Sequence, residues 1–357
     1  MRLRTPPARL ITLLAALVSL SAAVLPSDAA AHVRWFTPYG PYWDPEWDRF
    51  LTLPVLLAVL AVGIVVATLA VAQRLIGDPL WPRPPFLQRM ELSAPAILGV
   101  QAAIAIIYAA TQLDIFVPNI ELPRNPLGFA IAGVAIVAGF TYITGVLTRV
   151  GALLTVGLFI LALFYGAWYE ALEQVIFVGI ALYLMAVGRG VVRYGGVQEE
   201  DRSPISDWLR PHALRILRWS AGLSVLILGL TEKLLAPELG VAFLQEYPNF
   251  NVLGELGIEW FTDRRFVFAA GIVEVTAGAA LLSGYLPRVV ILVLWIPFNL
   301  GIPFLPPTEL IGHLPILATM YVLLVRGTEG IPPREARAWP AQHRAEEIFR
   351  RPQPARA

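Results

Sequence analysis

Cysteine is absent from the 357 residues, and this absence excludes several kinds of site at once. Without a thiol the chain can form no disulfide, thiolate nucleophile, iron–sulfur cluster or cysteine-ligated zinc site. Histidine is also scarce, which leaves little room for a haem held by two histidines; the four are His32, His212, His313 and His343. The sequence therefore gives no evident haem, flavin or metal site.

Charge is the second scarce property. Only 15% of the residues are charged and the formal net charge is +1, which implies no nucleic-acid partner. Hydrophobic residues make up 57% of the chain, and runs of about 20 apolar residues, enough to cross a bilayer, recur along it. The sequence predicts an all-α polytopic membrane protein that has the lipid bilayer as its first partner.

Nine transmembrane helices are predicted after an N-terminal signal peptide. Residues 1–31 combine a basic start, an apolar core from Leu10 to Leu25 and small residues before His32, as a signal peptide does. An uncleaved anchor helix is the alternative for this segment. The predicted spans are 51–73, 93–112, 127–147, 150–167, 174–188, 219–235, 266–284, 287–303 and 310–325.

Segments outside the spans have distinct compositions. Residues 32–50 are rich in tryptophan, tyrosine and proline, and we expect them to lie without helix along the outer interface. The polar stretch 191–214 is predicted to be a cytoplasmic linker, and the Arg- and Pro-rich stretch 328–357 a cytoplasmic tail.

The distribution of cations predicts the orientation. Apart from the three arginines of the signal peptide, 18 cations fall on one side of the nine spans and six on the other. Positive residues concentrate on the cytoplasmic side of membrane proteins. We therefore expect a bacterial or archaeal cell (inner) membrane protein with its mature N-terminus outside and its C-terminus in the cytoplasm.

An internal repeat with a shift of 139 residues is also predicted. Gly145-Val-Leu-Thr-Arg149 matches Gly284-Tyr-Leu-Pro-Arg288, and Ala138-Gly139 matches Ala277-Gly278. Each unit contains four helices, an even number, so the two four-helix bundles should be parallel in the membrane. The units are 93–190 and 215–327, with the 51–73 helix outside both. The small pairs should let neighbouring helices approach closely.

Lys233 is the only lysine, against 26 arginines. A compact ammonium is not interchangeable with a planar guanidinium, so this exception invites a functional interpretation. The alternative is an ordinary cation at a helix end that reaches toward the interface.

Polar residues gather in the outer half of the second unit. Glu232 and Lys233 end its first helix, and Glu274 lies about eight residues, roughly 12 Å, below the outer end of its second. Asn299 is near the outer end of the third helix and His313 near the start of the fourth. The matching positions of the first unit carry the uncharged residues Ala135, Ile160 and Gln174.

An ionisable group inside a membrane span is a functional candidate by default. We predict Lys233, Glu274 and His313 as catalytic residues and Glu232 and Asn299 as substrate-binding residues. The alternative for Lys233 and Glu274 is a purely structural ion pair. For His313 it is an interfacial hydrogen bond.

The motif Gly229-x-x-Glu-Lys233, followed by Glu274-x-x-x-Gly278, Gly284 and Arg288, resembles the DoxX family of small four-helix membrane proteins. The resemblance covers residues 215–327, and the first unit shares only its glycine and arginine framework. It implies a role as a thiosulfate:quinone oxidoreductase or quinol oxidase component, with Lys233 and Glu274 at the family's charged positions. The duplication, the signal peptide and the additional helix depart from the single-unit pattern.

Two classes of function follow. In the first, the protein is a quinone-linked redox subunit, in which Lys233, Glu274 and His313 serve a quinone carbonyl and a partner protein supplies electrons. In the second, it is a non-catalytic scaffold or small-solute transporter, in which the same charges line a path or a partner contact. Retention of quinone by the purified protein would favour the first.

Overall fold

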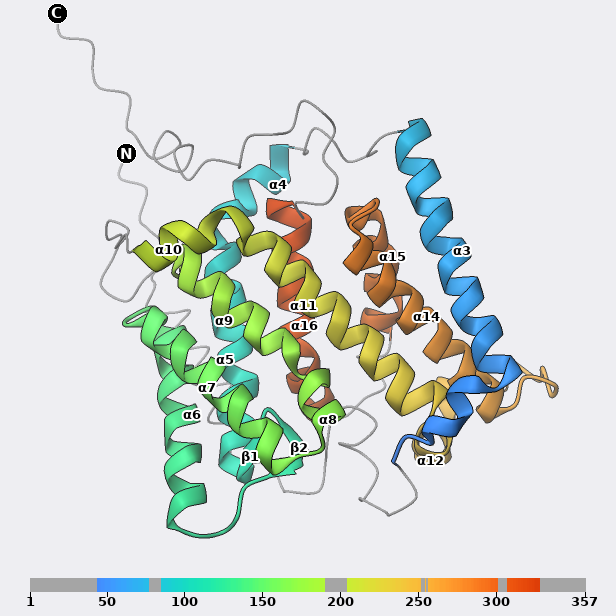
Figure 1. Ribbon diagram of the computed structural model, residues 1–357, viewed down its shortest axis with the longest axis horizontal. Coiled ribbons are helices and arrows are strands. Elements are labelled where there is room, and N and C mark those ends of the chain that lie inside the picture. The colour runs from blue at the N-terminus through green and yellow to red at the C-terminus, as the bar shows by residue number, and fades with distance from the viewer. Residues whose placement is uncertain are drawn as a thin grey trace, which may run out of the picture.

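The computed structural model describes residues 44–76, 85–189, 204–251, 254, 256–300 and 307–327, without the side chains of 76, 85, 88, 89, 92, 249, 296–300 and 307–309. The predicted signal peptide, most of the aromatic segment, much of the linker and the predicted tail lie outside these residues. Helices make up most of the described chain and run largely alongside one another (Figure 1).

A helix occurs at each of the nine predicted ranges. The helices are α3 (Leu53–Ile76), α5 (Ala94–Gln112), α6 (Pro126–Thr144), α7 (Thr148–Tyr165), α9 (Val175–Val187), α11 (Ala213–Leu228), α14 (Asp263–Ser283), α15 (Pro287–Leu300) and α16 (Pro307–Arg326).

Within the described residues, six helical stretches are long and apolar enough to cross a membrane, which agrees with a polytopic helical membrane protein. They are Leu53–Leu75, Ala94–Gln112, Pro126–Thr144, Thr148–Tyr165, Pro204–Leu234 and Asp263–Ser283. Val175–Val187 and Leu310–Arg326 are shorter apolar helices.

Short elements connect the long helices. The helical ones are η1 (Trp47–Leu51), α4 (Pro85–Met90), η2 (Glu91–Ser93), α8 (Trp168–Glu173), α10 (Pro204–Leu209), η3 (Arg210–His212), η4 (Gly229–Leu234), α12 (Pro237–Glu246) and η5 (Pro248–Phe250). The sequence analysis predicted no strands, but β1 (Asp114–Ile115) and β2 (Val117–Glu121) form a small antiparallel hairpin after α5. Expecting no helix before residue 51 was wrong, since η1 is a 3-10 helix of five residues.

The long helices pack as two rings of four. In the first, α5 packs on α6, α6 on α7, α7 on α9, and α9 on α5. In the second, α11 packs on α14, α14 on α15, α15 on α16, and α16 on α11. The rings meet along two seams, α9 against α11 and α5 against α16, while α3 packs on the outer side of α14 (Figure 1).

Two tight turns join successive helices within these rings. Gly145 (φ 77°) ends α6 and Gly284 (φ 75°) ends α14, both in the left-handed region that glycine adopts without a Cβ clash. Two residues later, Leu147 and Leu286 also have positive φ, at 54° and 42°. The turns at these two places thus share their backbone conformation.

An arginine after each turn hydrogen-bonds to the end of a neighbouring helix. Arg149 Nε donates to the Met185 carbonyl at 3.3 Å, and Arg288 Nε donates to the Leu324 carbonyl at 3.1 Å. The last turn of a helix leaves carbonyls without an internal partner, which a guanidinium can satisfy. Donors and acceptors are both 139 residues apart, the shift found in the sequence.

Glycines bring α11 and η4 close to α14. A Cβ on Gly222 would lie 2.9 Å from the Gly278 carbonyl oxygen, and one on Gly278 would lie 2.6 Å from the Gly222 carbonyl oxygen. Both contacts are with backbone atoms, so neither can be relieved by moving a side chain. The close approach expected at Gly278 is confirmed. Small residues of this kind let helix backbones touch in membranes, where packing drives association.

Gly278→Ala should therefore destabilise the protein by about 1–3 kcal/mol, the usual range for overpacking. Gly157→Ala is the matched control, because nothing lies within 4 Å of a Cβ at that helical glycine. The control should be neutral or stabilising by up to about 1 kcal/mol, as alanine is the better helix former. Thermal unfolding in detergent measures both, and equal midpoints would contradict the close packing of α11 on α14.

Candidate functional site

The C-terminal end of α11 continues as a π-helical turn, η4, which the sequence analysis predicted as ordinary α-helix. The Leu235 amide donates to the Leu230 carbonyl at 2.9 Å, a bond to the fifth residue back. Such turns insert an extra residue and occur often at functional sites. Here the turn carries Thr231, Glu232 and Lys233, so it changes the directions in which three polar side chains leave the helix.

Lys233 and Glu274 form an ion pair. Lys233 Nζ lies 2.7 Å from Glu274 Oε2, and the two side chains are 17% and 25% exposed. Glu274 is near the middle of α14, which begins three residues earlier than predicted, so the carboxylate is deeper in the helix than expected. An ion pair between apolar helices replaces part of the hydration that each charge loses.

The pair depends on two more glycines. A Cβ on Gly229 would lie 2.8 Å from Glu274 Cβ, and a Cβ on Gly271 would lie 2.9 Å from Lys233 Cβ. Each charged residue therefore stands opposite a glycine of the partner segment. The absence of a side chain at these positions lets η4 and α14 lie close enough for the short contact.

Helix α3 packs beside this pair. Its Ala58 and Val62 are buried together with Leu234, next to Lys233, and Val275, next to Glu274. The α3 sequence carries no charge between Leu53 and Gln73, so it contributes only apolar contacts there. On the side that faces α3, Lys233 and Glu274 therefore lie next to an apolar helix.

A second polar contact links η4 to the first ring, and sequence reasoning missed it. Thr231 Oγ1 lies 2.5 Å from Glu173 Oε1, and the Ser224 hydroxyl donates to the Glu173 carbonyl. The Glu173 side chain is buried at 1% exposure at the end of α8, and Glu232 is buried at 2%. The signal was available in the acidic residue directly before the predicted 174–188 span. That Thr231 would be the partner of this acid could not be predicted, because their contact depends on the π turn.

The remaining predicted residues lie on other elements. His313 is half-buried on α16, a helix that packs mainly on α5 of the first ring. Asn299 is in the last turn of α15, and its side chain lies outside the described residues. The structure therefore brings together Lys233 and Glu274, with Glu232 in the same turn, and places His313 on a seam helix.

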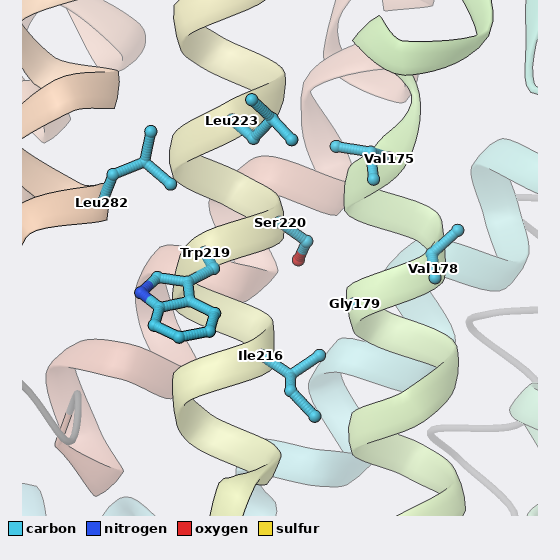
Figure 2. Close-up of a pocket in the computed structure, with 8 residues that line it drawn as sticks. All are labelled: Val175, Val178, Gly179, Ile216, Trp219, Ser220, Leu223 and Leu282. Carbon is cyan, nitrogen blue, oxygen red and sulfur yellow. The ribbon is translucent and has the colours of Figure 1, made fainter.

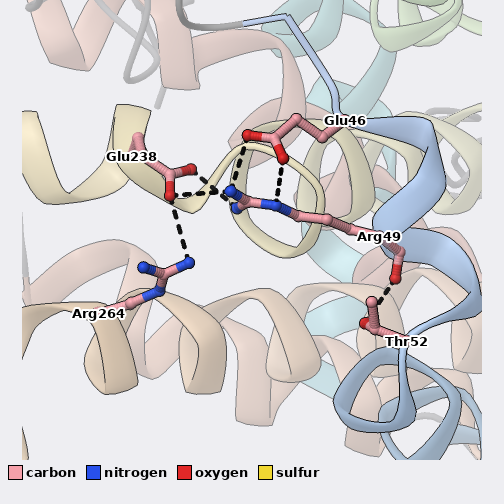
Figure 3. A network of polar contacts seen from close by, with 5 residues as sticks. All are labelled: Glu46, Arg49, Thr52, Glu238 and Arg264. Carbon is pink, nitrogen blue, oxygen red and sulfur yellow. Dashed lines mark hydrogen bonds and ion pairs between the residues drawn. The ribbon is translucent and has the colours of Figure 1, made fainter.

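A network of charges connects the chain before α3 to α12 and α14 (Figure 3). Arg49 Nη1 of η1 lies 2.9 Å from Glu238 Oε2 of α12, and Arg264 Nη2 of α14 lies 3.3 Å from Glu238 Oε1. Burial alone would raise the pKa of Glu238, but hydrogen bonding and charge from Arg49 hold that pKa below its usual range. The Glu46 amide also donates to the Leu235 carbonyl, which ties this segment to the end of η4.

Asp114 is a buried acid that the sequence analysis did not single out. It follows α5 in β1, is 7% exposed, and stands opposite Glu121 in the hairpin register. Burial, and then the charge of Glu121, raise the pKa of Asp114 to about 8. Its position directly after an apolar span was the available sequence signal.

A groove lies at the seam between the rings, away from the ion pair (Figure 2). Its volume is about 490 Å³, and its walls include Val175 and Val178 of α9, Trp219 and Leu223 of α11, and Leu282 of α14. Leu223, the groove residue of α11 nearest to Lys233 in sequence, precedes it by ten residues, roughly 15 Å along a helix. The groove therefore does not contain the predicted polar site. Within the described part of the chain, no three acidic or histidine side chains gather as a metal site would require.

Comparisons with known proteins assign no relative to this arrangement. No protein-family model, no curated protein and no solved structure matches the chain.

The contribution of the ion pair to stability can be measured with a double-mutant cycle. Lys233→Met and Glu274→Gln should each destabilise the protein, by up to about 3 kcal/mol, because each leaves one charge without its partner. The double variant should recover most of that loss, since no unpaired charge remains. Unfolding midpoints of the four proteins give the coupling energy. Additive losses would show that the two side chains do not interact.

Stability should also depend on pH through Asp114. Its pKa is raised in the folded protein, so folding favours the protonated form, and this contribution is lost as pH rises from about 4 to about 8. Each unit of pKa difference corresponds to about 1.4 kcal/mol. Asp114→Asn should remove this part of the pH dependence, and Glu121→Gln should shift it to lower pH. Unfolding midpoints between pH 5 and pH 9 test this, and an unchanged profile in Asp114→Asn would contradict it.

Proposed function

We propose that the chain is a DoxX-like integral membrane subunit with a quinone-linked redox role, centred on Lys233 and Glu274. The observation that carries this proposal is their 2.7 Å ion pair, formed by the only lysine on a π-helical turn between apolar helices. The resemblance to the DoxX family in 215–327 supplies the redox class, as a component of a thiosulfate:quinone oxidoreductase or quinol oxidase.

The proposed architecture consists of nine membrane spans in two parallel four-helix units, 93–190 and 215–327, with α3 outside both. Supporting it are the matching turns at Gly145 and Gly284, the matched arginine contacts 139 residues apart, and the same order of packing in both rings. Helices α9, α15 and α16 would be the shorter spans.

The proposed location is a bacterial or archaeal inner membrane, with the N-terminus outside and the C-terminus in the cytoplasm. The basis is the excess of arginine on one side of the nine helices. A topology reporter fused after Arg356 should be active only in its cytoplasmic form. Periplasmic activity of that fusion would overturn the count of nine spans.

The proposed chemistry uses the two charges in different roles. Lys233 donates a hydrogen bond to a quinone carbonyl, and Glu274 exchanges the protons that accompany two-electron reduction, while a partner redox protein supplies the electrons. The side chains of Lys233 and Glu274 are both partly exposed, so the head group of a quinone could reach them from the lipid side. Glu232 lies in the same turn. In this proposal Asn299 and His313 approach from α15 and α16.

Quinone retention tests the proposal at Glu274. Glu274→Gln removes the carboxylate that positions the Lys233 ammonium. The quinone should then lose its hydrogen bond to that charged group, and the amount of quinone that copurifies should fall about tenfold. Ala135→Gln places the same side chain at the corresponding buried position of the first unit and should leave retention unchanged once stability is matched.

Lys233→Arg separates the quinone role from a scaffold or transport role. A guanidinium keeps the charge but not the compact shape of the ammonium, so retention should fall nearly as far as in Lys233→Met. Full retention in Lys233→Arg, or no quinone in the wild-type protein, would favour a non-catalytic scaffold or small-solute transporter.

A further inference from the structure

The groove between α9 and α11 has walls suited to a hydrocarbon chain. Val175, Val178 and Leu223 line it, and Trp219 is 48% exposed beside them (Figure 2). Ser220 is its single hydroxyl, and that hydroxyl donates to the Leu217 carbonyl at 3.0 Å within the same helix. The groove therefore presents carbon to whatever lies in it.

The floor of the groove is closed by tight packing. A Cβ on Gly179 would lie 1.6 Å from Ser220 Oγ, so α9 and α11 are in direct contact beneath it. This contact is also the seam between the two helical rings. A molecule in the groove would touch both rings and would not pass between them.

Basic side chains stand at the end of the groove that is nearer the start of α11. Arg215 precedes Trp219 by four residues, and His212 precedes Ile216 by four, so each lies one turn from a groove residue on the same helical face. Arg210 lies in the same short segment, and among the described residues of α10 and η3 the one acid is Asp207. Within this described stretch, Arg210 and Arg215 outnumber Asp207.

An exposed aromatic side chain lies on α10, the short helix that precedes this basic segment. Trp208 of α10 is 71% exposed, although α10 packs against the end of α9. Tryptophan is enriched where membrane meets water, because its ring suits the headgroup region. Along α10, η3 and α11, the exposed tryptophan Trp208 is therefore followed by basic side chains and then by the apolar groove.

We propose that this groove and its basic end bind an anionic phospholipid of the inner leaflet. One acyl chain lies against Trp219 and Leu223, and the phosphate lies by Arg215 and His212. The lipid bridges the two rings at the α9–α11 seam. The proposal rests on the membrane orientation given under Proposed function but not on a quinone role, so a failure of either can be recognised separately.

The test measures which lipid the full chain retains. The purified protein, stripped of lipid in detergent, is titrated with dioleoylphosphatidylglycerol or dioleoylphosphatidylcholine, and bound lipid is counted by native mass spectrometry. The wild type should bind phosphatidylglycerol at least about fivefold more tightly, because one cation near a headgroup contributes about 1 kcal/mol. Equal binding of the two lipids would overturn the proposal.

A matched pair of arginine variants localises the site. Arg215→Gln should weaken phosphatidylglycerol binding about fivefold. Arg74→Gln, at the end of the apolar helix α3 and beside the exposed Leu75, should not change it. If Arg215→Gln does not fold, Arg215→Met takes its place with the same expectation. Equal losses in the Arg74 and Arg215 variants would show general surface attraction and overturn the site.

The chain-binding half is tested independently. Leu223→Trp fills the groove and should abolish the preference for phosphatidylglycerol, and Val178→Phe serves if the first variant does not fold. Glycerol 3-phosphate, which has the anion without the chains, should fail to compete at concentrations at which the lipid saturates. Effective competition, or an unchanged preference in the filled groove, would show a free-anion site and overturn the proposal.

Discussion

The antiparallel contact of α11 and η4 with α14 is the interaction on which the rest of the site depends. Gly222 meets Gly278 at one level, and Gly229 and Gly271 stand opposite Glu274 and Lys233 at the next. In a bilayer no hydrophobic effect drives helices together, so close backbone contact must supply the attraction. The same contact sets the distance between the two charges.

The ion pair in turn limits how these helices can rearrange. A charge left alone among apolar helices is costly, so sliding α14 along η4 would have to carry both partners together. The apolar surface of α3 packs against the same junction through Val62 and Val275. Close packing and charge pairing therefore favour one register.

Much of this could be predicted from the sequence, because the signals were local. Runs of apolar residues placed the nine helices, and Gly145 and Gly284 placed two turns that need a positive φ. The rarity of lysine pointed to Lys233, and Glu274 was its expected partner. The parts that could not be predicted depend on distant contacts. The π turn at 229–234, the Thr231–Glu173 contact and the packing of α16 on α5 have no local pattern that requires them.

The position of α3 has a consequence for how the protein is made. Helix α3 enters the membrane before either ring exists, and the helix it packs on, α14, is made only after Asp263. Because α3 has no charge between Leu53 and Gln73, it can remain in the lipid without a protein partner until α14 has been made. The two charged residues are not separated in this way. Lys233 follows α11 and Glu274 lies on α14, the next long helix, so each charge is made shortly before or after its counterion. The order of synthesis therefore leaves α3, which is apolar, without its packing partner for longest, whereas α11 and α14, whose contact contains the charge pair, are made one after the other.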